Sequence, residues 1–251
     1  MLEIRDAYKI FQKGTPDERV ALDHVSLFLR QGDFVTIVGS NGAGKSTLFN
    51  AITGGFPLDG GRVLLAGEDI TWLPSHKRAF MIGYLFQNPM KGTAPNMTIE
   101  ENLSLAYSRK KTWALGPGVS KKDTVFFRER LALYGMGLED RMSAKVGLLS
   151  GGQRQALALL MSTVAGPRLL LLDEHTAALD PASAEKVMNI TLDIARNQNL
   201  TTLMITHNVQ QALRFGNRTL MLEKGKILLD IEGAERNNMT VPRLLEHFPG
   251  A

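Results

Sequence analysis

Cysteine is absent from the 251 residues, so the chain has neither a disulfide framework nor a thiolate metal site. The longest apolar runs, residues 156–165 and 169–172, are interrupted by a Gly-Pro-Arg segment. Neither run approaches the roughly 20 residues that a membrane-spanning helix needs. The first residues are charged and contain no apolar core, so we expect no signal peptide. These absences favour a soluble protein that reaches a membrane only through a partner.

The composition excludes little. Hydrophobic residues make up 44% and charged residues 22% of the chain, which is ordinary for a globular protein. The net charge of +4 and the pI of about 9.3 suit an anionic partner such as nucleotide, nucleic acid or an inner membrane leaflet. A mildly basic enzyme with scattered surface charge fits equally well. The length allows one large core with an attached subdomain.

Residues 39–47, Gly-Ser-Asn-Gly-Ala-Gly-Lys-Ser-Thr, match the phosphate-binding pattern G-x-x-x-x-G-K-[ST] in full. An apolar run, residues 34–38, precedes them, and an apolar-periodic segment opens at Leu48. Such a loop directs successive N–H groups inward at the start of a helix, where anions are favoured. Lys45 would neutralise the β- and γ-phosphates, and the Ser46 hydroxyl would bind Mg²⁺. A Gly-rich turn with a solvated lysine is the alternative, but it leaves the complete pattern unexplained.

Alternating apolar and polar residues predict an antiparallel pair of strands at residues 2–10 and 21–29, with a third strand at 62–66 in the same sheet. Phe11 follows the first strand. Its ring could stack on an adenine base held by the phosphate loop, or it could be a core residue of this small sheet.

Residues 81–86 predict a strand that ends before Gln87. Thr98 and Glu101 have the spacing of a capping box, which opens a helix to about residue 109. We expect a loop at 110–120 and a helix at 121–134. The absence of a strand pattern between Gln87 and Ser150 indicates a helical insertion into an α/β domain.

Ser150, Gly151, Gly152 and Gln153 precede a long apolar helix and form either a second anion site or an ordinary helix cap. The apolar strand expected at residues 168–172 ends in two acidic residues. Its carboxyl end belongs at the edge of the sheet where α/β proteins bind ligands.

The two acidic residues, Asp173 and Glu174, could be a simple helix cap. With a phosphate loop upstream, Asp173 is more readily explained as holding Mg²⁺ through its water shell and Glu174 as polarising an attacking water. After Asp180 a helix runs to about residue 198, and a strand at 201–206 ends in His207. That histidine could contact the γ-phosphate or be merely a polar strand end.

In this order, these motifs resemble the nucleotide-binding subunit of an ATP-binding cassette (ABC) transporter over essentially the whole chain. The resemblance implies a P-loop NTPase fold with a RecA-like α/β core. It also implies an antiparallel β subdomain at residues 1–33 and 56–80 and an inserted helical subdomain at residues 88–150.

The resemblance further implies ATP and Mg²⁺ as ligands, with ATP clamped between two copies in a head-to-tail dimer. The residues placed at ATP in one copy are Phe11, Gly39, Ser40, Asn41, Gly42, Ala43, Gly44, Lys45, Ser46, Thr47 and Gln87. The serine-glycine signature of the other copy, Ser150, Gly151, Gly152 and Gln153, completes the site, with Asp180 at the dimer contact. Ser46, Gln87 and Asp173 would hold Mg²⁺, while Glu174, as base, His207 and Lys45 would act in catalysis.

His175 stands where members of this family usually have proline after the catalytic glutamate. It is either a pH-sensitive group near the γ-phosphate or only a turn-compatible residue. The Asp-Glu-His-Thr variant resembles bacterial importers that work with an extracytoplasmic substrate-binding protein, with aromatic amino acids as one candidate substrate class.

Our functional hypothesis is an energy-coupling subunit attached through a separate integral membrane permease to the cytoplasmic face of the membrane. The alternative is a soluble ABC ATPase that acts on nucleic acid or ribosomes. Sustained heptads between the phosphate loop and the signature are absent, and each motif occurs once. We therefore expect a transporter subunit without a nucleic-acid partner. A nucleotide kinase would leave the signature and His207 unexplained.

Overall fold

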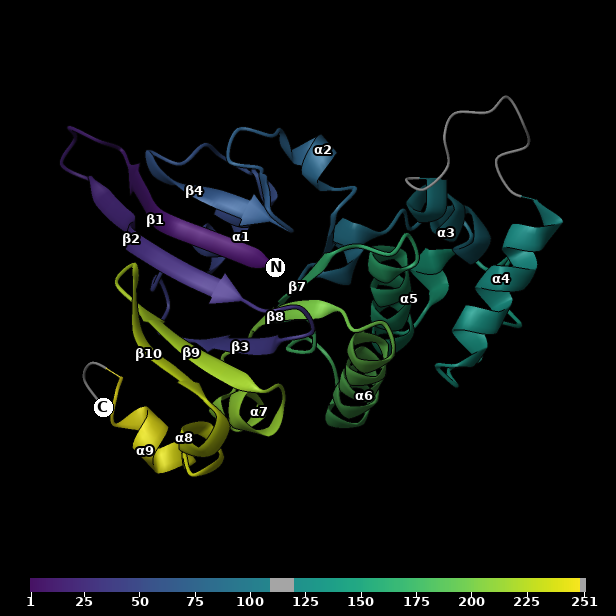
Figure 1. Ribbon diagram of the computed structural model, residues 1–251. Coiled ribbons are helices and arrows are strands. Elements are labelled where there is room, and N and C mark those ends of the chain that lie inside the picture. Colours follow the sequence, from purple (N-terminus) through teal and green to yellow (C-terminus); the bar gives the residue numbers. More distant parts are fainter. Residues whose placement is uncertain (109–119, 249–251) are drawn as a thin grey trace.

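The computed structural model describes residues 1–108 and 120–248. Within that part of the chain one sheet has four antiparallel strands in the order β2-β1-β4-β5 (Figure 1). Its strands are β1 (Leu2–Phe11), β2 (Arg19–Leu29), β4 (Gly60–Leu65) and β5 (Glu68–Asp69). Leu2 pairs with Leu29 on one side and with Leu65 on the other. The predicted antiparallel pair and its third strand are therefore confirmed.

A second sheet has the strand order β10-β9-β3-β8-β7-β6. Its strands are β3 (Phe34–Val38), β6 (Ile82–Leu85), β7 (Leu169–Asp173), β8 (Thr201–Ile205), β9 (Arg218–Glu223) and β10 (Lys226–Glu232). All neighbours are parallel except β10, which pairs antiparallel with β9. The first four strands confirm the sequence predictions, and the carboxyl ends of the parallel strands meet at one edge.

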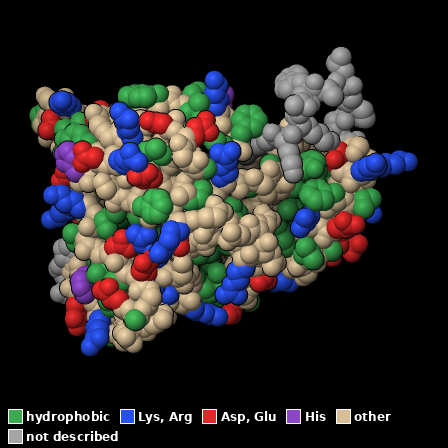
Figure 2. Space-filling view, viewed as in Figure 1, with side chains coloured by type: hydrophobic (Ala, Val, Ile, Leu, Met, Phe, Trp, Pro, Cys, Tyr) green, Lys and Arg blue, Asp and Glu red, His purple; other side chains and the backbone are tan. Residues whose placement is uncertain are grey.

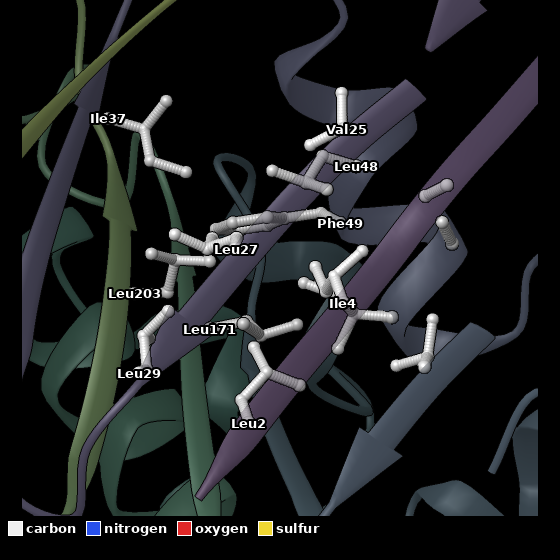
Figure 3. Close-up of a cluster of buried hydrophobic side chains, with 14 of the residues drawn as sticks. Leu2, Ile4, Val25, Leu27, Leu29, Ile37, Leu48, Phe49, Leu171 and Leu203 are labelled. Carbon is white, nitrogen blue, oxygen red and sulfur yellow. The ribbon is translucent and has the colours of Figure 1, made fainter. Parts of the chain in front are cut away.

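One large apolar cluster fills the space between the two sheets and helix α1 (Lys45–Thr53) (Figure 3). Leu48 and Phe49 of α1 are fully buried there. The other side chains labelled in the figure come from β1, β2, β3, β7 and β8: Leu2, Ile4, Val25, Leu27, Leu29, Ile37, Leu171 and Leu203. This shared core packs the antiparallel sheet against the helix that follows the phosphate loop.

The middle of the chain is helical, with α3 (Ile99–Tyr107), α4 (Lys121–Ala132) and α5 (Gly151–Thr163) on the right of Figure 1. Thr98 and Glu101 form the predicted capping box of α3. Between β6 and α5 the described residues contain two short 3-10 helices, Pro89–Gly92 and Val146–Leu148, and no strand. Helix α3 ends at Tyr107, slightly before the expected end at about residue 109. Of the loop expected at 110–120, only Ser120, the N-cap of α4, lies within the described residues.

The remaining helices are α2 (Ser75–Arg78), α6 (Pro181–Asn197), α7 (Val209–Arg214), α8 (Gly233–Asn237) and α9 (Val241–Leu245). Helices α7, α8 and α9 gather below β9 and β10 in Figure 1. A small cluster that includes Val38, Ala212, Met221 and Leu244 joins α7 and α9 to the parallel sheet. The sequence analysis predicted no element beyond His207. Across the described residues, none of these helices combines the length and apolar character needed to span a membrane.

Arg78 is a buried cation at the carbonyl end of α1. Only 3% of its surface is exposed, and its Nη1 donates to the carbonyls of Ala51 and Ile52 at 2.8 Å each. Its other nitrogens donate to the carbonyls of Thr71 and Leu73 at 2.7 Å. The last carbonyls of a helix lack partners within the helix, and a cation there is favoured by the helix dipole. Arg78 therefore joins α1 to the segment between β5 and α2.

We predict that Arg78→Met lowers the free energy of unfolding by about 3 kcal/mol, because several buried carbonyls lose their donor at once. Denaturant unfolding of the purified chain measures this change. Arg5→Met is the matched control, since Arg5 is exposed and pairs with Glu3 on the surface, where solvent screens the pair and its loss should change the stability little. Equal losses in the two variants would contradict this account of Arg78.

Candidate functional site

The phosphate loop connects β3 to α1, and helix α1 begins at Lys45 with Gly44 as its N-cap. A Cβ at Gly39 would lie 2.1 Å from the carbonyl oxygen of Leu222, and one at Gly44 would lie 2.5 Å from that of Ala21. Gly44 also has φ of 105°. Glycine is required at both positions because neighbouring backbones leave no room for a side chain.

Lys45 folds back into this loop. Its Nζ donates to the carbonyls of Gly39 and Ser40, each at 2.8 Å. Burial lowers the pKa of Lys45, while Glu174 is the first of the nearby carboxylates that oppose this shift. A buried ammonium group without a paired anion favours a bound anion, and phosphate oxygens would meet that requirement.

Residues distant in the sequence support the loop. Glu223, at the end of β9, accepts a hydrogen bond from the Ser40 hydroxyl. In the β9–β10 turn, the Gly225 N–H donates to the carbonyl of Ala43 at 2.9 Å. Arg19 donates to the carbonyl of Gly42. The sequence analysis missed Arg19, Glu223 and Gly225, because no short motif connects them to the loop.

A cavity of about 250 Å³ opens beside the loop. Its lining residues are Phe11, Arg19, Ala21, Asn41, Gly42, Gly44, Lys45, Ser46, Thr47 and Glu174. Phe11, the last residue of β1, is 37% exposed and contacts Phe56 edge to face with ring centroids 5.3 Å apart. The alternative that Phe11 is a core residue of the small sheet is therefore wrong. Its ring borders the cavity, where a flat base could stack on it.

Asp173 and Glu174 stand at the carboxyl end of β7, as predicted. One oxygen of Asp173 accepts a hydrogen bond from the hydroxyl of Tyr84 at 2.9 Å. Burial raises the pKa of Asp173, and the neighbouring charge of Glu174 adds to the effect. A cation beside this carboxylate would favour its charged form. Tyr84, on the neighbouring strand β6, was not predicted as part of the site.

Glu174 is the meeting point of three strand ends. Its Oε2 accepts from Nε2 of Gln87 at 3.2 Å and lies 3.3 Å from Nδ1 of His207. The three residues follow β6, β7 and β8. Glu174 has φ of 45°, an uncommon value for a residue with a side chain, and strained backbone of this kind is concentrated at functional sites. The structure thus brings together Gln87, Glu174 and His207 beside the cavity that Lys45 lines.

The signature residues lie elsewhere. Ser150 caps α5 and accepts from the N–H of Gln153 at 3.3 Å, while Gln153 Oε1 accepts from the Ser150 N–H at 3.2 Å. Asp180 caps α6 in the same way through the N–H of Ser183 at 3.0 Å. A Cβ at Gly152 would lie 2.9 Å from the side chain of Ser183, so the two helix starts are adjacent. Residues 150–153 and Asp180 do not line the cavity at Lys45.

The side chain of His175 is buried against α6. It is 2% exposed, and its ring nitrogen lies 3.3 Å from the hydroxyl of Thr191 on α6. Burial lowers the pKa of His175 to about 4, so the ring is neutral at ordinary pH. The hypothesis of a pH-sensitive group near the γ-phosphate is therefore not supported.

Comparisons with known proteins agree with this geometry. A family model described as ABC transporter matches residues 22–177. The chain is 42% identical over 248 residues to the tyrosine transport ATP-binding protein of Clostridioides difficile (strain R20291), covering 99% of this chain and 98% of the relative. It is 35% identical to the thiamine import ATP-binding protein ThiQ of Salmonella typhimurium (strain LT2), covering 80% of this chain and 81% of that protein.

Solved structures give the same result. A dimeric, post-hydrolysis structure of the ATP-binding cassette MJ0796, bound to ADP and Pi, superposes with a TM-score of 0.78 at 28% identity, covering 92% of this chain and 98% of that one. The ATP-binding cassette MJ1267 superposes with a TM-score of 0.81 at 27% identity, covering 98% and 97%.

The fold and the sequence similarity together define a P-loop NTPase of the ATP-binding cassette type. The chain belongs to the ABC transporter family. It is the ATP-binding, energy-coupling subunit of such a transporter, and its reaction is the hydrolysis of ATP.

The burial of His175 predicts a pH dependence of stability. Between about pH 6.5 and pH 4 the unfolded chain protonates this histidine and the native one does not. The free energy of unfolding should therefore decrease as the pH is lowered through this window. Protonation of His175 in the unfolded chain should account for on the order of 3 kcal/mol of that decrease. In His175→Asn this part of the dependence of the unfolding free energy on pH should disappear. Between pH 7 and pH 8 the free energies of unfolding of the two proteins should change with pH in parallel. An unchanged slope in the variant, measured by denaturant titration at each pH, would overturn the prediction.

Proposed function

We propose that this subunit drives the uptake of a small solute by binding ATP between two head-to-tail copies and hydrolysing it. The observation that carries the proposal is the arrangement of Gln87, Glu174 and His207 around one carboxylate, next to the cavity that contains Lys45. A carboxylate held by two neighbours at the end of a phosphate-binding cavity can receive a proton from an attacking water.

Each residue at the cavity has a separate proposed role. The N–H groups of residues 39–47 and the ammonium of Lys45 bind the phosphates, and Phe11 stacks on the adenine. Glu174 orients the water and accepts its proton while Gln87 and His207 hold that carboxylate and face the γ-phosphate. Charge develops on the phosphate and the attacking water in the transition state. Groups that are already positioned to stabilise this charge account for much of the rate enhancement.

Mg²⁺ fits the same place. The hydroxyl of Ser46, the carboxylate of Asp173 and the amide oxygen of Gln87 are oxygen ligands of the kind Mg²⁺ prefers. Burial raises the pKa of Asp173, and a cation beside this carboxylate would favour its charged form. When bound, the ion neutralises charge on the β- and γ-phosphates.

The second copy supplies the signature in our proposal. Ser150 and Gly151 are exposed at the start of α5, whose first N–H groups can face an anion. They do not line their own chain's cavity, so they can reach ATP only from a partner. Asp180, adjacent to them, lies at the contact between copies. The dimeric state of the cassette MJ0796 supports this arrangement.

We expect Glu174→Gln to bind ATP but to lose hydrolysis by about 100-fold or more, because the amide keeps the shape but cannot accept a proton. Loss of a negative charge near the γ-phosphate should also stabilise an ATP-bound dimer. Steady-state hydrolysis and size-exclusion chromatography with light scattering, with and without ATP, measure both effects.

Three further variants separate the steps. Adding Ser150→Ala to Glu174→Gln should weaken the ATP-bound dimer, whereas Lys45→Ala should weaken nucleotide binding itself. Glu185→Gln changes an exposed glutamate that pairs with Arg214 on the surface, and it should match the wild type. Near-normal hydrolysis in Glu174→Gln would show that the base is assigned wrongly.

The membrane partner is a permease, to which this subunit attaches at the cytoplasmic face of the membrane. We place its contact on residues 87–97 and the adjoining helices. A groove of about 230 Å³ lies there, lined by Phe86, Lys91, Leu105, Met161 and their neighbours. A groove lined by apolar side chains together with a lysine suits an amphipathic helix of a partner.

Because the chain contains no cysteine, this contact can be mapped with single introduced thiols. Leu105→Cys in the groove should cross-link to the permease in the assembled transporter. Phe28→Cys on β2 is the matched control, since the two side chains are similarly exposed, at 55% and 51%. Cross-links confined to Phe28→Cys would refute the proposed contact.

The name of one relative supports our proposal for the substrate class. The protein that shares 42% identity is named for tyrosine transport, so an aromatic amino acid is our proposed solute, delivered by an extracytoplasmic substrate-binding protein. The alternative of a nucleic-acid or ribosome partner is not favoured by relatives named for transport and import. On the face shown in Figure 2, Lys and Arg side chains also lie among Asp and Glu side chains rather than forming one basic patch.

A further inference from the structure

Arg236 of α8 is a buried cation outside the nucleotide site. It is 8% exposed, and its Nη2 donates to the carbonyls of Ala212 and Leu213 at 3.0 Å and of Phe215 at 2.6 Å. Over residues 1–108 and 120–248, the structure pairs it with no carboxylate. Its positive charge is instead stabilised by the carbonyl end of α7, where the helix dipole favours a cation.

Two threonine hydroxyls extend this contact to the parallel sheet. Nε of Arg236 donates to the hydroxyl of Thr219 on β9 at 3.0 Å, and that hydroxyl lies 2.9 Å from the hydroxyl of Thr36. Thr36 donates to the carbonyl of Ala212 at 2.9 Å. Thr36 belongs to β3, the strand that leads into the phosphate loop. The carbonyl end of α7 is thus tied to β3, β9 and α8 at once.

The N-terminal end of α7 lies close to His207: Asn208 is the N-cap and the helix starts at Val209. Asn208 caps the helix by accepting from the N–H of Gln211 at 3.0 Å, and its own N–H donates to the hydroxyl of Thr206 at 3.1 Å. The N–H of Thr206 donates to the carbonyl of Ile37 at 3.1 Å. His207 is therefore held between the end of β8 and the start of α7.

Helix α7 has only six residues. Helices this short are not stable by themselves and take their position from tertiary contacts. The bonds from Arg236 supply such contacts at the end opposite to His207. A small rotation of α7 would move His207 relative to Glu174, and their present separation of 3.3 Å leaves little tolerance.

We propose that Arg236 is a positioning residue for ATP hydrolysis, which holds α7 so that His207 stays beside Glu174. The inference rests on the role proposed above for His207. Arg236 itself touches neither nucleotide nor the reacting atoms. Its effect should therefore pass through His207 and should vanish when that side chain is absent.

A double-mutant cycle on the full-length chain tests this coupling. Arg236→Met should lower kcat for ATP about 10-fold while KM changes about twofold or less, because the nucleotide contacts remain. In a His207→Ala background, the same substitution should change kcat by about twofold or less. Arg236→Lys keeps the positive charge and one donor group, so its kcat should lie between those of the wild type and Arg236→Met.

Arg78→Met is the matched control, because Arg78 also caps the carbonyl end of a helix and is also buried. Its loss should change kcat by the same factor with and without His207. Thermal unfolding of all variants, compared at equal fractions of folded protein, separates this coupling from a general loss of stability.

The outcomes are distinct. Equal losses of kcat for Arg236→Met in both backgrounds, or no loss in either, would overturn the inference. If His207→Ala alone hydrolyses ATP at the wild-type rate, the proposed role of His207 fails first. If Arg236→Met does not fold, the same double-mutant cycle can be carried out with Arg236→Lys and with Thr219→Val. If the effects of both substitutions on kcat are additive with that of His207→Ala, the inference is overturned.

Discussion

The close approach of backbone to backbone at the phosphate loop is the constraint on which the rest of the structure depends. At Gly39 and Gly44 the loop passes so near to Leu222 and Ala21 that no side chain fits. These two neighbours belong to β9 and β2, one from each sheet. The loop is therefore packed between both sheets at the start of α1, which connects the nucleotide site directly to the core that the sheets share.

A second theme is the use of backbone carbonyls to hold buried cations. Lys45, Arg78 and Arg236 all donate to carbonyl oxygens, and burial lowers the pKa of each. The physical consequences differ with the acceptor. The carbonyls at Arg78 and Arg236 are helix ends, where the bond fixes a helix in place. Those at Lys45 belong to the phosphate loop itself, so a phosphate bound in the loop can compete for the ammonium group.

The arrangement of the site also explains why one copy of the chain is insufficient in our proposal. The strand ends that carry Gln87, Glu174 and His207 converge on one carboxylate, while Ser150 lies at the start of a helix that faces away from the cavity. A polyphosphate bound at the loop would leave one side open to water. Closing that side with the signature of a second copy would exclude water and strengthen each electrostatic contact.

The sequence by itself determined those features whose signal is local. The run at 169–172 is apolar throughout, and that at 34–38 is apolar except for Thr36, because strands buried on both faces have no solvent-facing side. Capping at Thr98 and Ser150 follows from residues three apart. The phosphate loop and its order relative to Glu174 and His207 are likewise readable from the chain. These local signals were also sufficient to indicate the ABC transporter family.

Only the tertiary structure decided which distant residues support them. Glu223 and Gly225 reach the loop across about 180 residues of chain. Tyr84 bonds to Asp173 from another strand, and Arg236 reaches α7 from beyond β10. A short motif contains neighbouring residues that bind the same ligand, so it can be recognised in the sequence. A buried donor and a distant carbonyl become partners only through the packing of the elements that carry them. His175 shows the same limit, since its position beside Glu174 suggested a role in the site and burial against α6 removed it.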